Sequence, residues 1–574
     1  MNRMRRTRIR RINADFLSIR LGCIICLLLV ACPNSVHAQG IVPPLDIPLL
    51  LSGNFGELRS NHFHSGIDFK TQGATGLPVK SVKDGSISRI SVSPYGYGRA
   101  VYIDHPDGTT SVYGHLERFS HRIETVVRDS QYREASFSVN LRFSADELVL
   151  KKGEVFAFSG NTGGSAGPHL HFEFRDTQME TALDPLPYFK KYIKDVQAPE
   201  IRSLMFFPQP GKGIINGNTG NQIIALSQDK AGKKQLTQSV KAWGAIGIGI
   251  KAYDRMTGTA NIYGVNEITL IIDNTEVYCS EIANFAFEDT RYINSLIDWK
   301  DWKENNSFHI KSFIEPGNKL AIYHALSDGI ITLSEEKTYH CKYILKDVFG
   351  NTTTLPFEIT GVRQNIPEYK PKGILFSYNR HNTLKEKGVD LNIPAGNLYK
   401  DAWLPIETTA GYTDFAPLYS LGEQTPLHSY CELTLAIPND TYPDKSKYGV
   451  IAVSGKRNAW LGGKYDAGKI KTRIRELGDF SVTIDTVPPV ITPVNPTKWT
   501  KNRRFSFKIS DNLSGIESYK GDLDGNFVLF EYDAKTNSLF YEYDSQRMPK
   551  GAKTLHLIVK DGAGNQSEFG WEIF

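Results

Sequence analysis

Short stretches of alternating apolar and polar residues, separated by turn-forming residues, recur along most of this 574-residue chain. Examples are HLHFEF at 169–174, FSVNLRF at 137–143, YCELTLAIP at 430–438 and YGVIAVSG at 448–455. Alternation with a period of two places successive side chains on opposite faces of a strand. Thr, Ile, Val and Tyr are frequent in such stretches, and Gly, Pro, Asn and Asp stand between them. The pattern predicts a mainly β chain, and its length predicts several domains.

The first 38 residues have a different pattern. Residues 1–20 are rich in arginine, and residues 21–32, LGCIICLLLVAC, form an apolar run too short to span a bilayer as a helix. This order is typical of an export signal. Three routes stay open: cleavage after Ala38, removal of residues 1–31 with lipidation of Cys32 in the lipobox-like LVAC, or an uncleaved anchor. Each takes the protein out of the cytoplasm, to the periplasm or, as a lipoprotein, to the outer membrane or cell surface.

One module occurs twice in the chain. DVQAPEI at 195–201 is similar to DTVPPVI at 485–491. In the same order, AYDRMTG at 252–258 is similar to ISDNLSG at 509–515, and KDVFGN at 346–351 to KDGAGN at 560–565. Short strands and Asp/Asn-Gly turns predict that both copies are immunoglobulin-like β-sandwiches. The predicted domains are a signal peptide at 1–38, a glycine- and histidine-rich domain at 39–194, sandwiches at 195–362 and 485–574, and an additional β-domain at 363–484.

The net charge of the chain gives no support to nucleic acids as partners. The formal charge is +5, but it falls to −1 without residues 1–38, which contain seven arginines, one aspartate and no lysine. A mature chain near neutrality gives no electrostatic reason to expect nucleic-acid binding. Of the six cysteines, three are in the leader. The other three are Cys279, Cys341 and Cys431. No two of them form a CxxC pair, which argues against a thiolate zinc site, and the sequence does not decide whether two of them form a disulfide.

The candidate chemistry is concentrated in the domain at 39–194. In the strand predicted for HLHFEF, His169 and His171 lie on one face and Leu170 on the other. Glu173 shares the histidines' face, where it is a candidate partner that orients an imidazole. An HxH triplet by itself is more often an ordinary polar sheet face than a metal site, so its interpretation depends on other residues.

Those residues lie upstream, where HSGID contains His64 and Asp68, and YGHL contains His115. Histidine and carboxylate are ligands of zinc, and with one histidine of the triplet they make three ligands and leave a fourth position for water. An unligated histidine such as His115 can orient or deprotonate that water. His62 is an alternative to His64 as the ligand. Structural roles are also open, since Asp68 can cap a turn and His115 can be an ordinary sheet histidine.

Together these motifs resemble the lysostaphin-type, or β-lytic, family of zinc endopeptidases. The resemblance covers about residues 52–189 and consists of HSGIDF, GLPVKSVKDGSI, YGYGRAVYIDHPDG, SVYGHL, KKGEVFAFSGNTG and GPHLHFEFR in that order. It implies a small antiparallel β-sheet with an open groove that has the metal at its floor. It also implies one Zn²⁺ per chain, held by His64, Asp68 and His171, with His115 and His169 as unligated catalytic histidines.

The activity implied by the resemblance is hydrolysis of peptide cross-links in bacterial peptidoglycan by zinc-activated water, with stem peptides as the substrate. The leader and the β-domains favour a Gram-negative envelope, where the expected bond is the D-alanyl–diaminopimelate bridge. The alternative is a non-enzymatic envelope regulator, or a glycan- or peptidoglycan-binding protein, with the same fold. Such regulators typically lose ligands, whereas all five positions are filled here. The C-terminal β-domains are candidates for spacers or for binding a protein partner.

One segment departs from the family pattern. Residues 117–150 lengthen a connection between YGHL and KKGE that is usually short. Because the segment follows His115 directly, we expect it to form a wall of the groove and to narrow the range of substrates. The alternative is a solvated surface hairpin that contains the strand predicted for FSVNLRF.

Overall fold

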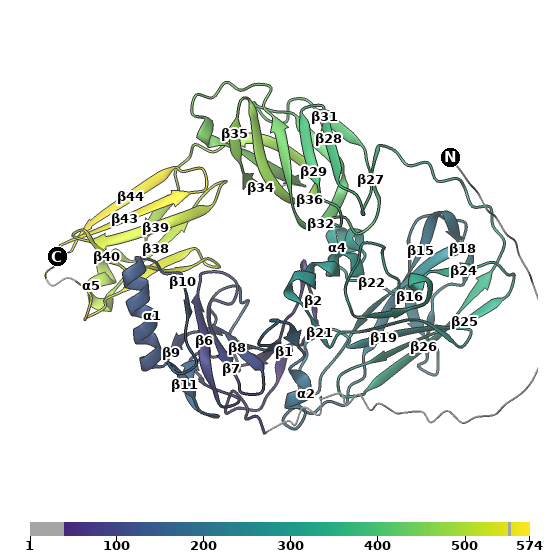
Figure 1. The fold of residues 1–574 in the computed structure, drawn as a ribbon, viewed down its shortest axis with the longest axis horizontal. Helices are drawn as coiled ribbons and strands as arrows, with labels where there is room; N and C mark the ends of the chain where they lie inside the picture. Colours follow the sequence, from purple (N-terminus) through teal and green to yellow (C-terminus); the bar gives the residue numbers. More distant parts are fainter. Residues whose placement is uncertain (1–39, 456, 549–550, 552, 574) are drawn as a thin grey trace, which may run out of the picture. The chain divides into compact units, whose positions relative to one another are not determined.

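The computed structural model describes residues 40–455, 457–548, 551 and 553–573. The predicted leader, with Ala38 and Cys32, lies outside these residues. Within them, strands predominate and helices are few and short (Figure 1), which confirms the predicted mainly β fold. No described helix is long and apolar enough to cross a membrane. The three described cysteines are free thiols.

One antiparallel sheet carries the candidate residues. Its strand order is β1-β4-β13-β8-β7-β6-β10. The strands are β1 (Leu51–Gly53), β4 (Ile67–Lys70), β6 (Gly85–Val92), β7 (Arg99–Asp104), β8 (Thr109–Leu116), β10 (Val139–Arg142) and β13 (His169–Asp176). A smaller sheet contains β5 (Pro78–Lys80), β12 (Val155–Phe158) and β9 (Arg118–Phe119). Because β13 lies between β4 and β8, the sheet brings together three segments that are far apart in the sequence.

The strand β13 has the alternation predicted for HLHFEF. Leu170, Phe172 and Phe174 are fully buried in the core. The residues that alternate with them lie on the opposite face, and they include His169, His171 and Glu173. Two faces of this kind require a strand, because a helix does not separate alternate residues. Packing of the apolar face therefore determines the direction in which the histidines point.

Backbone pairing determines the neighbours of His171. In the pairing of β13 with β4, His171 lies opposite Asp68. In the pairing of β13 with β8, it lies opposite Gly114. His115 follows Gly114 directly, so the same rung of the sheet places it near His171. A metal-binding or catalytic group assembled here rests on the register of three adjacent strands, which a shift of one residue would destroy.

The segment at 117–150 differs in part from the prediction. FSVNLRF contains the predicted strand, β10, which pairs with β6. The residues before it form α1 (His121–Glu134), a helix that was not predicted. The buried residues of α1 are Ile123, Val127, Ser130 and Gln131. Their spacing of three and four residues is that of a helix packed along one side, so the segment as a whole is not a surface hairpin.

The remaining described residues are also built from strands. A second large sheet lies within residues 200–361, with β15 (Glu200–Ile215), β18 (Val240–Tyr253), β26 (Thr352–Gly361) and β25 (Thr338–Lys346) as successive neighbours. The strands predicted at 430–438 and 448–455 lie largely in β32 (Leu418–Ala436) and β33 (Tyr448–Ser454). Residues 374–484 and 490–573 contain separate hydrophobic cores. The immunoglobulin-like topology and the domain boundaries stay predictions.

Two four-stranded sheets make up the last part of the chain, in the orders β37-β38-β42-β41 and β40-β39-β43-β44. Their strands are β37 (Val490–Pro493), β38 (Arg504–Ser510), β39 (Ile516–Leu523), β40 (Asn526–Val528), β41 (Glu531–Asp533), β42 (Ser538–Glu542), β43 (Thr554–Asp561) and β44 (Gln566–Glu572).

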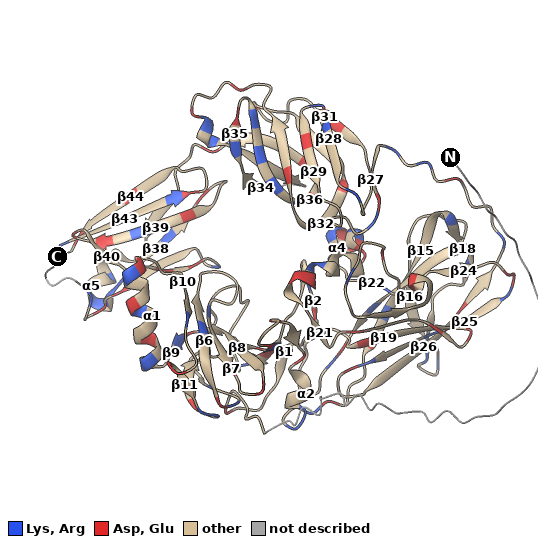
Figure 2. Ribbon diagram, viewed as in Figure 1, with Lys and Arg blue, Asp and Glu red and all other residues tan. Residues whose placement is uncertain are grey.

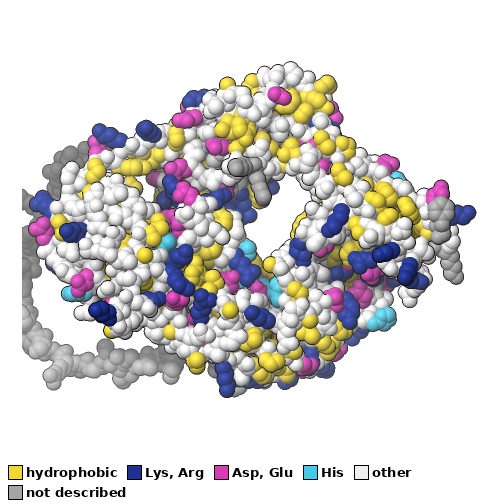
Figure 3. Space-filling model, turned by 180° about the vertical axis from the view of Figure 1, so that it is seen from behind, with side chains coloured by type: hydrophobic (Ala, Val, Ile, Leu, Met, Phe, Trp, Pro, Cys, Tyr) yellow, Lys and Arg dark blue, Asp and Glu magenta, His cyan; other side chains and the backbone are white. Residues whose placement is uncertain are grey.

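Charged residues of both signs are mixed along these strands and the other described elements (Figure 2). The face drawn in Figure 3 shows the same mixing of basic and acidic side chains.

Candidate metal centre

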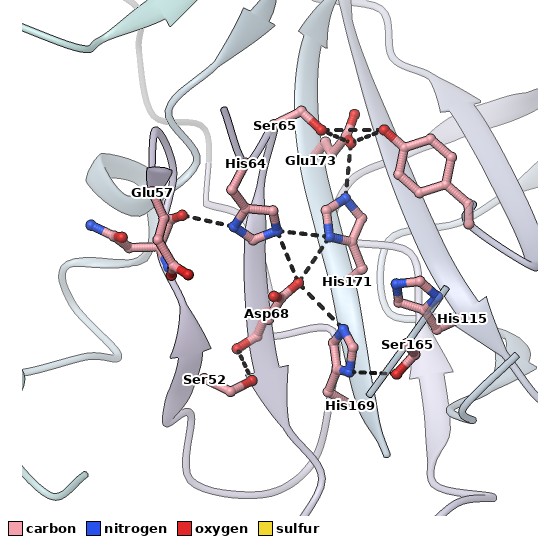
Figure 4. Close-up of polar contacts among 12 residues, drawn as sticks. Ser52, Glu57, His64, Ser65, Asp68, His115, Ser165, His169, His171 and Glu173 are labelled. Carbon is pink, nitrogen blue, oxygen red and sulfur yellow. Dashed lines mark hydrogen bonds and ion pairs between the residues drawn. The ribbon is translucent and has the colours of Figure 1, made fainter. Parts of the chain in front are cut away.

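Three side chains direct their donor atoms toward one another beside β4 and β13 (Figure 4). His64 Nε2 lies 3.1 Å from His171 Nδ1 and 3.1 Å from Asp68 Oδ1, and the last two atoms are 2.9 Å apart. All three residues are buried. Around a tetrahedral zinc ion with bonds of about 2.0–2.1 Å, donor atoms are about 3.3 Å apart. The three donors are therefore close to the spacing that one such ion requires.

The other ring nitrogen of each of these two histidines is bound to the protein. His64 Nδ1 donates to the carbonyl oxygen of Asn54 at 2.7 Å, and His171 Nε2 donates to Glu173 Oε1 at 2.8 Å. In its neutral form, a ring that donates from one nitrogen has its lone pair on the other. In both rings this lone pair is on the atom that faces Asp68, as a shared metal ion requires.

Glu173 holds His171 from a fully buried position. Its Oε1 atom also accepts hydrogen bonds from the Ser65 hydroxyl at 2.5 Å and the Tyr97 hydroxyl at 2.6 Å, and its Oε2 atom pairs with Arg175 Nη2 at 2.6 Å. Burial alone would raise the pKa of Glu173, but Arg175 and His171 outweigh it and lower the pKa to about 2. The carboxylate is therefore ionised, and the predicted contact with an imidazole of the same face is present.

The second oxygen of Asp68 is held by Arg59, whose Nη2 atom lies 2.8 Å from Asp68 Oδ2. Burial raises the pKa of Asp68, but the charge of His64 and hydrogen bonds from His169, His171 and His64 hold it well below its usual range. Asp68 is thus an ionised ligand whose free Oδ1 faces the two imidazoles. No local pattern in the sequence predicts this role for Arg59, which lies in the short strand β2 (Leu58–Arg59).

His115 stands beside the three donors but points its ring at another histidine. Its ring centroid lies 4.7 Å from that of His169, and its Nδ1 donates to the carbonyl oxygen of Thr162 at 2.8 Å. Burial and the neighbouring His171 and His169 lower the pKa of His115 to about 3. The ring is therefore neutral, with its lone pair on Nε2. The backbone of His115 has a φ of 58°, an uncommon value outside glycine that the surrounding sheet maintains.

His169 is oriented in a similar way. Its Nδ1 donates to the carbonyl oxygen of Gly167 at 2.8 Å, and its Nε2 lies 3.4 Å from Asp68 Oδ1. Its side chain is 15% exposed, against 5% for His171, so His169 is the more accessible of the two. This difference suits a ring that meets a substrate rather than one that is enclosed around an ion.

The segment that carries His64 approaches β13 very closely. A Cβ atom on Gly66 would lie 2.2 Å from the carbonyl oxygen of Phe172, so glycine is required there.

His62, the alternative ligand, is exposed and its Nδ1 bonds the carbonyl oxygen of Ser60 at 2.8 Å. The geometry therefore favours His64 over His62.

A cleft of about 1060 Å³ lies next to this network. One part of the cleft is lined by Tyr97 and Arg175, and both of these residues contact Glu173. Another part is lined by residues 138–140 of the segment at 117–150. The segment therefore contributes to the wall of a cleft near the candidate site. An effect of this wall on the range of substrates stays a prediction.

Comparison with known proteins identifies the domain. Residues 62–132 match the model of peptidase family M23. This chain carries an M23 peptidase domain. The matched stretch contains His64, Asp68 and His115, whereas His169 and His171 follow it in the sequence. A second match, of residues 374–485, is to the Zu5-like domain.

Relatives resemble the M23 domain rather than the whole chain. The DD-carboxypeptidase/endopeptidase Mpg of Neisseria meningitidis serogroup B is 34% identical over 118 residues, which are 21% of this chain and 21% of that protein. The peptidoglycan DD-endopeptidase ShyB of Vibrio cholerae is 33% identical over 129 residues, 22% and 24% of the two chains. The chain thus matches less than a quarter of the length of either relative. The solved catalytic domain of lysostaphin from Staphylococcus simulans is 26% identical and covers 25% of this chain and 92% of its own, with a TM-score of 0.19.

The donor set of the M23 domain fits zinc. His64, Asp68 and His171 form a group whose ligand atoms lie within 4.8 Å of one another. Two imidazole nitrogens and one carboxylate oxygen are ligands that zinc accepts in a tetrahedral site, and three protein ligands leave one position open. Zinc is therefore the metal of this metallopeptidase domain, and these are the residues that would hold it.

Proposed function

We propose that this protein is an exported zinc endopeptidase that hydrolyses peptide cross-links of bacterial peptidoglycan. His64, Asp68 and His171 hold the metal, and His115 and His169 are the catalytic histidines. The observation that carries the proposal is the convergence of three donor atoms, no more than 3.1 Å apart, in a domain of a peptidase family. Two unligated imidazoles beside these donors supply the groups for proton transfer.

Each site residue has a defined task in this reaction. When bound, zinc supplies Lewis acidity, which lowers the pKa of water and polarises a peptide carbonyl. His115, neutral and with a lone pair on Nε2, accepts a proton from the attacking water. His115 then returns this proton to the leaving amine, and His169, more exposed and next to His115, stabilises the developing oxyanion when its Nε2 carries a proton. Glu173 and Arg59 keep His171 and Asp68 in position.

Two relatives and the leader support one bond of peptidoglycan as the substrate. Two relatives carry the specificity "DD" in their names, and one of them is named for peptidoglycan. This supports the D-alanyl–diaminopimelate bridge as the bond that is cut. Peptidoglycan lies outside the cytoplasmic membrane, so the function requires export, for which residues 1–38 supply the signal. The mass of the mature N-terminal peptide distinguishes cleavage after Ala38 from a lipid at Cys32.

Digestion of purified cross-linked peptidoglycan tests the function, with the muropeptides resolved by mass. The samples are the mature protein with zinc, with chelator, and with His169→Ala, and the matched control is His121→Ala, which changes an exposed histidine of α1. We expect cross-linked dimers to disappear only with zinc, in the wild type and the control. Unchanged muropeptides with folded, zinc-loaded protein would contradict the endopeptidase and favour the non-enzymatic regulator or binder.

A further inference from the structure

Two clusters of three aspartates lie outside the M23 domain, at equivalent places in the repeated module. In each cluster, one carboxylate oxygen of every residue lies within 4.8 Å of the others. The first cluster consists of Asp195, Asp254 and Asp347, and the second of Asp485, Asp511 and Asp561. The two copies share three similar motifs, and each motif supplies one aspartate, in the same order in both copies. The chain has therefore built the same acidic cluster twice.

The first cluster joins three separate segments of the chain. Asp195 lies in the connection that precedes β15, Asp254 follows β18 directly, and Asp347 follows β25 directly. The side-chain amide of Asn351 donates to Asp347 Oδ2 at 2.7 Å and to the carbonyl oxygen of Asp195 at 3.4 Å. The corresponding distances in the second cluster, from Asn565 to Asp561 Oδ2 and to the carbonyl oxygen of Asp485, are 2.8 and 3.1 Å. An asparagine at the equivalent position of each copy thus holds two members of its cluster in place.

Oxygens of the first cluster are buried without partners. Asp195, Asp254 and Asp347 are 8%, 4% and 6% exposed. Asp195 Oδ2 and Asp254 Oδ1 are buried atoms without a hydrogen-bond partner. A buried carboxylate oxygen without a partner is costly, and such groups usually bind a hydrogen-bond donor or a cation. Burial, with the negative charges of Asp347 and Asp195, also raises the pKa of Asp254 to about 8.

We propose that Asp195, Asp254 and Asp347 form a calcium-binding site. Every side-chain donor is a carboxylate oxygen, and ligands of this hard type bind Ca²⁺ and Mg²⁺ rather than zinc. Ca²⁺ accepts irregular coordination by about six to eight oxygens, whereas Mg²⁺ requires a near-octahedral shell that usually includes several waters. A buried cluster of carboxylates from three segments, with two oxygens free, suits the larger ion.

The position of the site gives the ion a structural task. Asp195 belongs to the chain that leads from the M23 domain into β15, whereas Asp254 and Asp347 follow strands of the second large sheet. A bound ion ties this connecting chain to the ends of β18 and β25. In the second cluster Asp511 Oδ1 is likewise buried without a partner, and the recurrence of the arrangement supports a common role.

The test counts calcium and zinc per chain after dialysis of the zinc-loaded full chain against calcium, and it measures thermal unfolding in the same samples. Asp254→Asn removes one cluster charge at nearly constant shape. The matched control, Asp328→Asn, makes the same charge change at an exposed residue of the same module, where asparagine suits the φ of 53°. We expect calcium to raise the wild-type Tm, and Asp254→Asn to bind one calcium ion fewer per chain than the wild type and the control.

Three results would overturn the proposal: a wild type that retains no calcium, an equal calcium count in Asp254→Asn and wild type, or retention of Mg²⁺ instead of Ca²⁺ when both are present. Should Asp254→Asn fail to fold, Asp347→Asn replaces it, and a wild type that retains no calcium still overturns the proposal. The zinc count in the same samples separates this site from the M23 centre, so the failure of one assignment leaves the other intact.

Discussion

His171 and Glu173, two residues apart on β13, are joined by a hydrogen bond of 2.8 Å between Nε2 and Oε1. Because alternate residues of a strand share a face, the spacing alone makes this contact available. The bond fixes the tautomer of His171 and leaves Nδ1 to face Asp68 and His64. The metal centre therefore depends on a carboxylate that does not reach the metal.

Glu173→Gln is expected to lower zinc affinity by about 10- to 100-fold, the usual cost of losing such an outer partner. The amide can still accept from His171 but lacks the charge that makes the imidazole a stronger ligand. Competition with a chromophoric chelator measures the affinity. Glu180→Gln is the matched control, because Glu180 is exposed and lies 3.8 Å from the same Arg175. Equal losses in both variants would show that the effect is not specific to His171.

His115→Asn is expected to keep bound zinc and lose about 10²- to 10⁴-fold in the rate of peptide hydrolysis. The variant removes the proton acceptor but none of the three converging donors. Asparagine is chosen because it tolerates the φ of 58° at this position. The zinc content and the turnover of a cross-linked muropeptide are measured together, with His121→Asn as the control. A variant that loses its zinc would place His115 among the ligands instead.

Zinc affinity is expected to increase with pH up to about 9. In the metal-free protein, burial lowers the pKa of His171, but Asp68 and Glu173 outweigh it and raise the pKa to about 9. Nδ1 cannot bind zinc while it carries the proton, so each pH unit below that value costs about tenfold in apparent affinity. Chelator competition between about pH 6.5 and 9 measures the slope. An affinity that stays flat, after correction for the chelator, would show that no proton is displaced.

Asp184 provides a test of stability in the same domain. It follows β14 (Ala182–Leu183), and burial raises its pKa from 3.8 to about 7. Stability from the protonated form is fully present below pH 3.8 and is lost as pH rises through about 7. Asp184→Asn is neutral at every pH, so it should increase the free energy of unfolding at pH 8, on the order of 4 kcal/mol, and less at pH 5. Denaturant unfolding measures both, and Asp146→Asn is the exposed control. An equal gain at both values would exclude the charge as the cause.

Parts of the site could be predicted because they depend on local patterns. Leu170, Phe172 and Phe174 alternate with polar residues, which determines the strand and the common face of His169 and His171. Arg59 and Tyr97 could not be found in this way. Their contacts with Asp68 and Glu173 depend on how segments outside β13 fold against this strand. The spacing of residues within one segment does not predict such contacts.

Two further features depend on more than a local pattern. Ile123 and Val127 have a helical spacing within α1, whereas the alternation of FSVNLRF in the same segment indicates a strand. The motifs of the two copies, at 195–362 and 485–574, predict the repeat. The convergence of its aspartates, however, depends on segments that meet only in the folded sheet. Long-range pairing, rather than the local pattern, decides both cases.

In the proposed reaction one zinc ion, held by His64, Asp68 and His171, supports peptide hydrolysis. The most direct test is titration of metal-free protein with zinc, with bound metal and the initial rate of cross-link cleavage recorded on the same samples. We expect the rate to rise in proportion to bound zinc and to reach its plateau at one ion per chain, and His171→Ala to show neither tight binding nor cleavage. Full activity without bound zinc, or no cleavage at one zinc ion per chain, would exclude peptide hydrolysis by this zinc site.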